Sequence, residues 1–212
     1  MRLLLPAAWV VLTACGGFDN GPLRVGEVKG QLSRVTPGRA FVAVLGEPES
    51  KLDVDASGSF TLKGVSAGAR ELLAVGGNEA AARVAVNVAA ASVVDLGSVA
   101  LYPAGEIEVV PLAPDHQKLS GAAITVAGTP WQQVPANSEG KLEIVGVPSG
   151  CWTVLVAVPG LAASTGEVCV DPGEHKRADL SLPAADGKSG SEGCRVTGCE
   201  VGYSCEGDGA CR

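Results

Sequence analysis

Basic and aromatic residues are scarce in this chain of 212 residues. Lysine and arginine number 16 against 23 acidic residues, which gives a net charge of −7, and no run of basic residues occurs. This argues against nucleic-acid binding, which needs clustered lysine and arginine to neutralise phosphates. Aromatic residues make up only 4% of the chain and the single methionine is Met1, whereas glycine and proline are abundant. The composition predicts many short strands joined by tight turns, with little helix.

Motifs of common enzymes are also missing. Only two histidines occur, His116 and His175, and neither begins an H-x-x-E or HExxH pattern of zinc ligands. No G-x-S-x-G elbow is present, and Gly187-Lys188-Ser189 lacks the first glycine of a phosphate-binding loop. Asp53–Gly58 imitates the start of a calcium loop, but the twelfth position is Gly64 instead of glutamate, so a tight turn is expected there. We therefore predict no enzyme activity, no cofactor and no resident metal.

The N-terminal residues 1–14 have the parts of an export signal. Arg2 is followed by an apolar run, Leu3–Leu12, and small residues precede Cys15. The run is too short to span a bilayer, which takes about 20 apolar residues. Leu12-Thr13-Ala14-Cys15 resembles the lipobox of bacterial lipoproteins, and the resemblance implies cleavage before Cys15 and acylation of that cysteine. The alternative is an ordinary secretory peptide with Cys15 there by chance.

The number of cysteines agrees with a lipidated Cys15. Seven cysteines leave one reactive thiol in an oxidising compartment, whereas the six that remain beyond Cys15 can pair completely. Two or more acyl chains hold a protein firmly on a membrane. Residues 15–24 are then a lipidated tether. Gly16 and Gly17 lack the aspartate that signals inner-membrane retention in related bacteria, so the resemblance implies the outer membrane of the cell envelope.

An internal repeat organises the chain beyond this tether. At an offset of 82 residues, Arg39–Gly46 aligns with Gly121–Gly128, and Ser57–Gly68 aligns with Glu139–Gly150, without gaps. Within each copy apolar and polar residues alternate between turn residues, a pattern typical of a two-layer antiparallel sandwich. The predicted fold class is all-β, with two tandem seven-stranded antiparallel sandwiches over residues 25–102 and 103–182.

The expected strands of the first copy follow from the same alternation, and the second copy repeats them to Leu182. They lie near Val25–Gln31, Ala40–Leu45, Lys51–Val54, Ser59–Leu62, Arg70–Val75, Arg83–Val88 and Val93–Leu101. The pattern of Asp55–Phe60 followed by Gly64–Gly68 and a strand resembles the carboxypeptidase regulatory-like, or transthyretin-like, domain. The resemblance implies an Ig-like sandwich and no particular function, because one sandwich fold serves many roles.

Two cysteines lie inside the second copy. Cys151 and Cys169 stand at equal distances from Gly160, the middle of an expected hairpin. Symmetric placement about a turn puts them opposite each other on antiparallel strands, at a separation that a disulfide bridges. Two buried thiols are the alternative. The first copy has Ala69 and Asn87 at the matching positions, so the bond is an addition to the fold and not a requirement of it.

The remaining cysteines lie in a short C-terminal module. Residues 183–193 have the composition of a flexible linker, and residues 194–212 carry four cysteines spaced C-x4-C-x5-C-x5-C. This module is too short to bury a core, so disulfides must hold it. It resembles the small cysteine-rich, growth-factor-like modules of bacterial surface lipoproteins. Three pairings are possible, of which Cys194 with Cys205 and Cys199 with Cys211 is favoured; a zinc site is the alternative.

Trp131 is the remaining candidate for ligand binding, together with Gln132 and Gln133. An exposed indole flanked by amides can stack on a sugar ring, whereas the alternative is that Trp131 covers an edge of a sandwich. The sequence as a whole predicts a membrane-anchored lipoprotein that acts as a noncatalytic binding or structural module of the cell envelope through protein–protein interaction. The alternative function is carbohydrate binding through Trp131. The expected partners are a membrane, through the lipid, and an envelope protein or glycan.

Overall fold

Every regular element in the described part of the chain is a β-strand. The computed structural model describes residues 24–112, 121–137 and 141–183. It confirms the all-β fold class predicted from the sequence. Fifteen strands follow one another in these residues: β1 (Val25–Leu32), β2 (Phe41–Val44), β3 (Glu47–Asp53), β4 (Ser59–Ser66), β5 (Gly68–Val75), β6 (Ala80–Val88), β7 (Val93–Val99), β8 (Tyr102–Pro103), β9 (Gly105–Leu112), β10 (Ala123–Val126), β11 (Val134–Pro135), β12 (Leu142–Val147), β13 (Gly150–Ala157), β14 (Ser164–Val170) and β15 (His175–Ser181).

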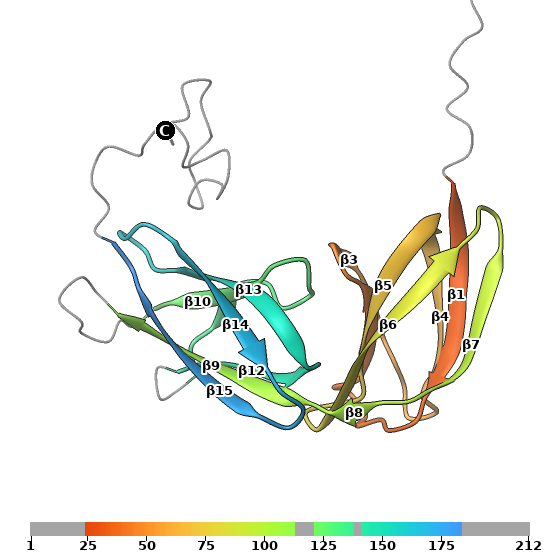
Figure 1. Cartoon of the computed structure of the whole chain (residues 1–212), viewed down its shortest axis with the longest axis horizontal. Helices are drawn as coiled ribbons and strands as arrows, with labels where there is room; N and C mark the ends of the chain where they lie inside the picture. The colour runs from red at the N-terminus through yellow and green to blue at the C-terminus, as the bar shows by residue number, and fades with distance from the viewer. Residues whose placement is uncertain (1–23, 113–120, 138–140, 184–212) are drawn as a thin grey trace, which may run out of the picture.

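The strands form two sandwiches, each built from two sheets (Figure 1). In the first sandwich a three-stranded sheet, β4-β1-β7, packs on a five-stranded sheet, β3-β2-β5-β6-β8. In the second sandwich the sheet β12-β9-β15 packs on the sheet β11-β10-β13-β14. The short strand β8 pairs with β6, so Tyr102 and Pro103 complete the first sandwich and Ala104 leads into the second.

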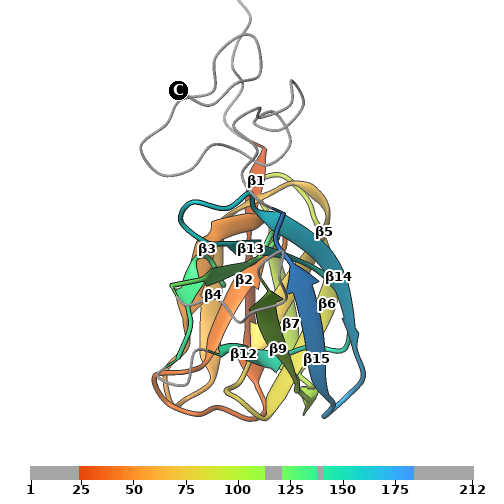
Figure 2. The ribbon, with the colours of Figure 1, turned by 90° about the vertical axis from the view of Figure 1, so that its left-hand side faces the viewer.

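One strand pair in each sandwich departs from the expected antiparallel arrangement. β1 and β7 are parallel, with Val28 opposite Val94, and β9 and β15 are parallel, with Val109 opposite Ala178. The other strand pairs of the described residues are antiparallel. Seen from the side of the second sandwich, β15 runs beside β9 (Figure 2). The sequence could not predict these pairs, because alternation determines which face of a strand is buried and not the direction of its neighbour.

The two sandwiches repeat each other at the offset of 82 residues. Strands β2, β5 and β7 have the same lengths as β10, β13 and β15 and begin 82 residues before them. The repeat extends to a hydrogen bond at the turn between β4 and β5 and at its equivalent between β12 and β13. Arg70 Nε donates to the Ser66 carbonyl oxygen at 3.0 Å, and Trp152 Nε1 donates to the Pro148 carbonyl oxygen at 2.9 Å. Two chemically different side chains therefore close the same turn.

A separate core fills the first sandwich. Its residues point inward from both sheets, and burial of each valine or leucine side chain contributes about 1.5–3 kcal/mol relative to exposure. The buried members are Val28, Leu32, Ala40, Val42, Val44, Val54, Phe60, Leu62, Val65, Leu72, Ala74, Ala80, Ala82, Val86, Val88, Val99 and Leu101.

The core of the second sandwich extends across the boundary into the first. It contains inward-pointing residues of the second sandwich, such as Ile124, Trp152 and Val154, together with residues from the outer face of the first five-stranded sheet. Successive residues of a strand point to opposite faces, so this sheet is buried on both sides. The two sandwiches therefore pack as one unit. The residues contributed by the first sandwich are Phe41, Ala43, Leu73, Val75 and Ala81.

Glycines allow close approach where the sandwiches meet. The Gly46 N–H donates a hydrogen bond to the Gly128 carbonyl oxygen at 2.8 Å, and these two residues are equivalent in the repeat. Gly146 has a φ of 77°, and a Cβ at this position would lie 2.6 Å from the Gly77 carbonyl oxygen. Both the backbone conformation and the contact therefore require glycine at position 146.

Candidate functional site

The structure describes five of the ten residues that the sequence singled out. No helix in this part of the chain is both long and apolar enough to cross a membrane. The lipidation candidate Cys15 and the tail cysteines Cys194, Cys199, Cys205 and Cys211 lie outside the described residues, as do the signal peptide and the linker. The remaining five all lie in the second sandwich: Trp131, Gln132, Gln133, Cys151 and Cys169.

Trp131 lies at the junction of the two sandwiches. Its ring makes edge contacts with Phe41 of the first sandwich and Trp152 of the second, at centroid distances of 5.8 Å and 6.4 Å. Each such pair contributes about 0.5–1.5 kcal/mol beyond the buried area. The indole is half-buried against the shared core. This environment matches the alternative in which Trp131 covers a sandwich edge, and it differs from the freely exposed indole expected for sugar stacking.

Gln132 and Gln133 stabilise the loop between β10 and β11. Gln132 Nε2 donates to the Thr129 carbonyl oxygen at 2.5 Å and to the Val126 carbonyl oxygen at 3.3 Å. The backbone N–H of Gln133 donates to Thr125 Oγ1 at 3.0 Å. The side-chain amide nitrogen of Gln132 thus makes both of these hydrogen bonds within its own loop segment.

An ion pair on the first sandwich extends the aromatic cluster. Arg83 Nε and Nη2 donate to the two carboxylate oxygens of Glu71 at 2.8 Å and 2.7 Å, a bidentate geometry that fixes the guanidinium plane. The hydrogen bond to Glu71 raises the pKa of Arg83 above its already high ordinary value. The guanidinium carbon lies 5.1 Å from the centre of the Trp152 ring, a cation–π contact that contributes about 0.5–1 kcal/mol. Phe41, Trp131, Trp152 and Arg83 thus form a continuous junction between the sandwiches.

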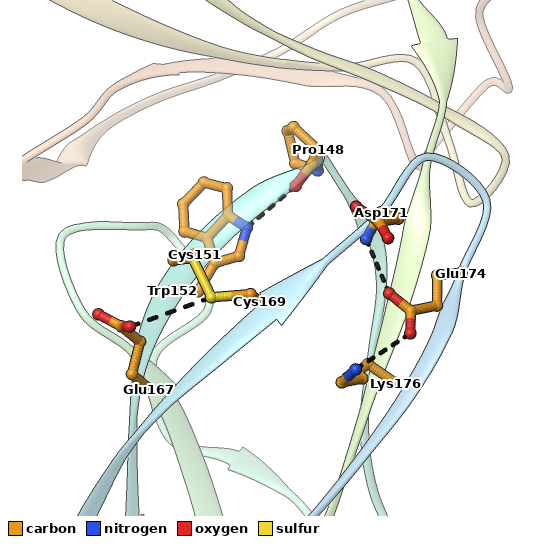
Figure 3. The surroundings of a disulfide bond; sticks show 8 residues. All are labelled: Pro148, Cys151, Trp152, Glu167, Cys169, Asp171, Glu174 and Lys176. Carbon is orange, nitrogen blue, oxygen red and sulfur yellow. Dashed lines mark hydrogen bonds and ion pairs between the residues drawn. A yellow bond between two sulfur atoms is a disulfide. The ribbon is translucent and has the colours of Figure 1, made fainter.

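Cys151 and Cys169 form a disulfide between β13 and β14 (Figure 3). They are directly opposite in register, their Cα atoms are 3.9 Å apart, and both side chains are exposed. This is the pair that the symmetric placement about the hairpin turn predicts. The equivalent residues Ala69 and Asn87 also face each other, across β5 and β6. The same strand pairing therefore forms with and without the covalent bond.

The sequence does not single out Glu108, a buried carboxylate on the outer face of β9. Its side chain is 9% exposed; Oε2 lies 3.4 Å from His175 Nε2 and Oε1 lies 3.9 Å from Arg177 Nη1. Glu106 Oε1 lies 4.0 Å from His175 Nδ1. The buried carboxylate requires polar partners, and the parallel pairing of β9 with β15 supplies them. Glu106 and Glu108 alternate with core residues, but their partners depend on a strand pairing that the sequence does not reveal.

Asp55 closes the turn between β3 and β4. Its Oδ1 accepts hydrogen bonds from Ser57 Oγ at 2.5 Å and from the Ser57 N–H at 2.9 Å. These bonds to the ionised form hold the pKa of Asp55 below its ordinary value. The calcium-loop-like sequence thus forms the tight turn with a capping aspartate that the sequence favours.

Two further carboxylates, the exposed Asp95 and the half-buried Glu174, are held in the ionised form by local donors. The pKa of Asp95 is lowered by the Gly97 N–H, which donates at 2.9 Å, and by Lys29, whose Nζ lies 3.1 Å away. The pKa of Glu174 is lowered by the backbone N–H of Asp171 and by Lys176. Glu174 thereby closes the turn between β14 and β15 (Figure 3).

Comparison of this chain with solved structures finds weak similarity. No family model and no curated protein matches it. The Bacillus anthracis TIE protein aligns with a TM-score of 0.33 and 16% identity over 76% of this chain, which spans 34% of the TIE chain. The shaft pilin SpaA from Lactobacillus rhamnosus GG aligns with a TM-score of 0.31 and 10% identity, covering 76% of this chain and 97% of the pilin. BcpA, the major pilin subunit of Bacillus cereus, aligns with a TM-score of 0.33 and 10% identity. The alignment covers 71% of this chain and 56% of BcpA.

Proposed function

We propose that this chain is a lipid-anchored protein of the bacterial cell envelope, in which two joined β-sandwiches act as a noncatalytic binding or structural module. The observation that carries the proposal is Leu12-Thr13-Ala14-Cys15, the lipobox-like end of the N-terminal apolar run. The cysteine count supports it, because acylation of Cys15 leaves six cysteines. Gly16 and Gly17 favour the outer membrane as the site of anchorage.

The junction between the sandwiches supports a role as a rigid module. Phe41 and Trp131 join the two sandwiches through side chains, and Gly46 and Gly128 join them through the backbone. A rigid unit on a lipid anchor presents its surfaces in a fixed relative geometry, which lowers the entropy lost when a partner binds. The proposed partner is another envelope protein. A glycan is less favoured, because the Trp131 ring is occupied by contacts with Phe41 and Trp152.

Substitution of the lipidation residue tests the anchor. Cys15→Ser removes the sulfur that accepts the lipid, so the variant is expected in the soluble fraction, whereas the wild type fractionates with membranes. Mass spectrometry of the wild type should find the lipid on an N-terminal cysteine at position 15. Cys151→Ser is a matched control that removes a cysteine from the second sandwich and should leave the protein in the membrane fraction. Membrane fractionation of Cys15→Ser, or a wild type without lipid, would contradict the proposal.

Crosslinking in intact cells tests the binding role separately. The lipidated wild type is expected to form a discrete crosslinked product with one envelope protein. The Cys15→Ser variant is expected to lose that product if the partner lies in the same membrane. A wild type that is correctly lipidated yet remains solitary after crosslinking would leave the anchor intact and contradict the protein partner.

A further inference from the structure

The disulfide of the second sandwich lies beside a carboxylate on an open surface. Glu167 precedes Cys169 by two residues on β14 and so points to the same face of the sheet. Its Oε1 lies 4.0 Å from Cys169 Sγ (Figure 3). Donor atoms of Cys151, Cys169 and Glu167 all lie within 4.8 Å of one another, and all three residues are exposed. Two sulfurs, bonded to each other, and one carboxylate oxygen therefore lie close together.

The first sandwich indicates that the pairing of β13 with β14 can form without the disulfide. Ala69 and Asn87 occupy the positions of Cys151 and Cys169, and they are paired in the same register. The strand pairing therefore does not depend on a covalent bond. Both sulfurs lie outside the core, so reduction does not expose apolar surface. We expect the reduced second sandwich to keep its fold.

We propose that reduction converts Cys151, Cys169 and Glu167 into a binding site for a soft divalent cation such as Zn²⁺. A dithiol supplies two electrons and two protons to the disulfide and itself becomes a disulfide, which leaves two thiols on the protein. The cation then displaces both thiol protons and binds the two thiolates, while the Glu167 carboxylate supplies the third ligand. Thiolates favour zinc and similar soft ions, and three protein ligands leave the fourth tetrahedral position to water.

The surroundings of Glu167 favour this role. Among the described residues no lysine, arginine or histidine lies within ion-pairing distance of its carboxylate, so the negative charge is available to a cation. Thr153 lies directly opposite Glu167 in register and is a small exposed residue. In the oxidised protein the sulfurs bond each other and bind no cation. The site is therefore controlled by the redox state of one bond.

Titration of the full chain with Cd²⁺ tests the proposal, because thiolate-to-cadmium charge transfer reports sulfur ligation directly. The protein is reduced with a phosphine under anaerobic conditions, and the same titration is run on Cys151→Ala/Cys169→Asn. That double variant copies the residues of the first sandwich, and all other cysteines are common to both proteins. The reduced wild type is expected to bind one equivalent more than the double variant. The extra equivalent is expected to be absent when the Cys151–Cys169 bond is intact.

Two further measurements make the test specific. Glu167→Gln is expected to weaken the extra equivalent by at least about tenfold, whereas the control Glu49→Gln, an exposed carboxylate on β3, leaves it unchanged. Circular dichroism is expected to report the same β-structure before and after reduction. Equal stoichiometry for the reduced wild type and the double variant, unchanged affinity in Glu167→Gln, or loss of β-structure on reduction would each overturn the proposal.

Discussion

The outer face of the first five-stranded sheet differs from the equivalent face of the second sandwich. In the first sandwich Phe41, Ala43, Leu73 and Val75 are each at most 7% exposed and belong to the core shared with the second sandwich. The positions 82 residues further on are half-buried or exposed, and all but Leu155 carry a smaller or more polar side chain than their equivalents in the first sandwich. They are Ala123, Thr125, Leu155 and Ala157.

The difference reflects what packs against the outer face of each sheet. A sheet that is covered on both faces needs apolar residues at every position of its strands. A sheet with one face in solvent needs them only at alternate positions. Phe41–Val44 is buried at all four positions, but Ala123–Val126 alternates between half-buried and buried. The side chains of the first copy create a junction, and those of the second copy give a sheet face on which no further sandwich of the described residues packs.

Substitution of Phe41 is expected to have the largest effect on stability, because this side chain lies in the shared core. Phe41→Ala removes the contact with Trp131 and leaves a void in the shared core, and it is expected to lower the free energy of unfolding by about 3 kcal/mol. Chemical denaturation measures the change. The reciprocal substitution in the second copy, Ala123→Phe, is expected to change the free energy by less than about 0.5 kcal/mol, because Ala123 is only half-buried and no further sandwich of the described residues packs on that face. Similar decreases in the free energy of unfolding for the two substitutions would contradict the difference between the two sheet faces.

The sequence predicts each sandwich better than it predicts their junction. Alternation and the 82-residue repeat are local signals, and they placed the strands of the first copy and the facing pair Cys151 and Cys169. The unbroken apolar run Phe41–Val44 was the available signal for a sheet buried on both faces. The packing of Phe41 on Trp131 was not predictable, because it depends on the relative placement of two sandwiches. The partners of Glu108 were missed because they require the parallel pairing of β9 and β15.

Two cysteines introduced into the first sandwich test whether the two hairpins are equivalent. Ala69→Cys/Asn87→Cys places two exposed cysteines opposite each other in the first sandwich, as Cys151 and Cys169 are in the second. The oxidised variant is expected to gain about 1–3 kcal/mol, since a closed loop of this size restricts the unfolded chain by about 3 kcal/mol and strain removes part of that. Denaturation with and without reductant measures the gain. A bond that fails to form under oxidation would contradict the equivalence of the two hairpins.

The smallest effect concerns the turns at Asp55 and its equivalent Asn137. The pKa of Asp55 is lowered by its bonds to Ser57, so the ionised carboxylate stabilises the folded state above its ordinary pKa of 3.8. That contribution is lost as the pH falls through the lowered value. Asp55→Asn gives the first turn the residue of the second, so stability should decline less steeply below about pH 4 than in the wild type. If the wild type and Asp55→Asn lose stability identically as the pH falls, the ionised Asp55 carboxylate does not stabilise the folded state.

The rotational diffusion of the two sandwiches, measured by ¹⁵N relaxation of backbone amides, reports directly whether they tumble as one unit. The junction through Phe41, Trp131, Trp152 and Arg83 joins them into one unit. A single diffusion tensor should therefore fit the amides of residues 25–112, 121–137 and 141–182 together. Two independent tensors, with the shorter correlation times of separate domains, would contradict a shared core and the rigid module proposed from it.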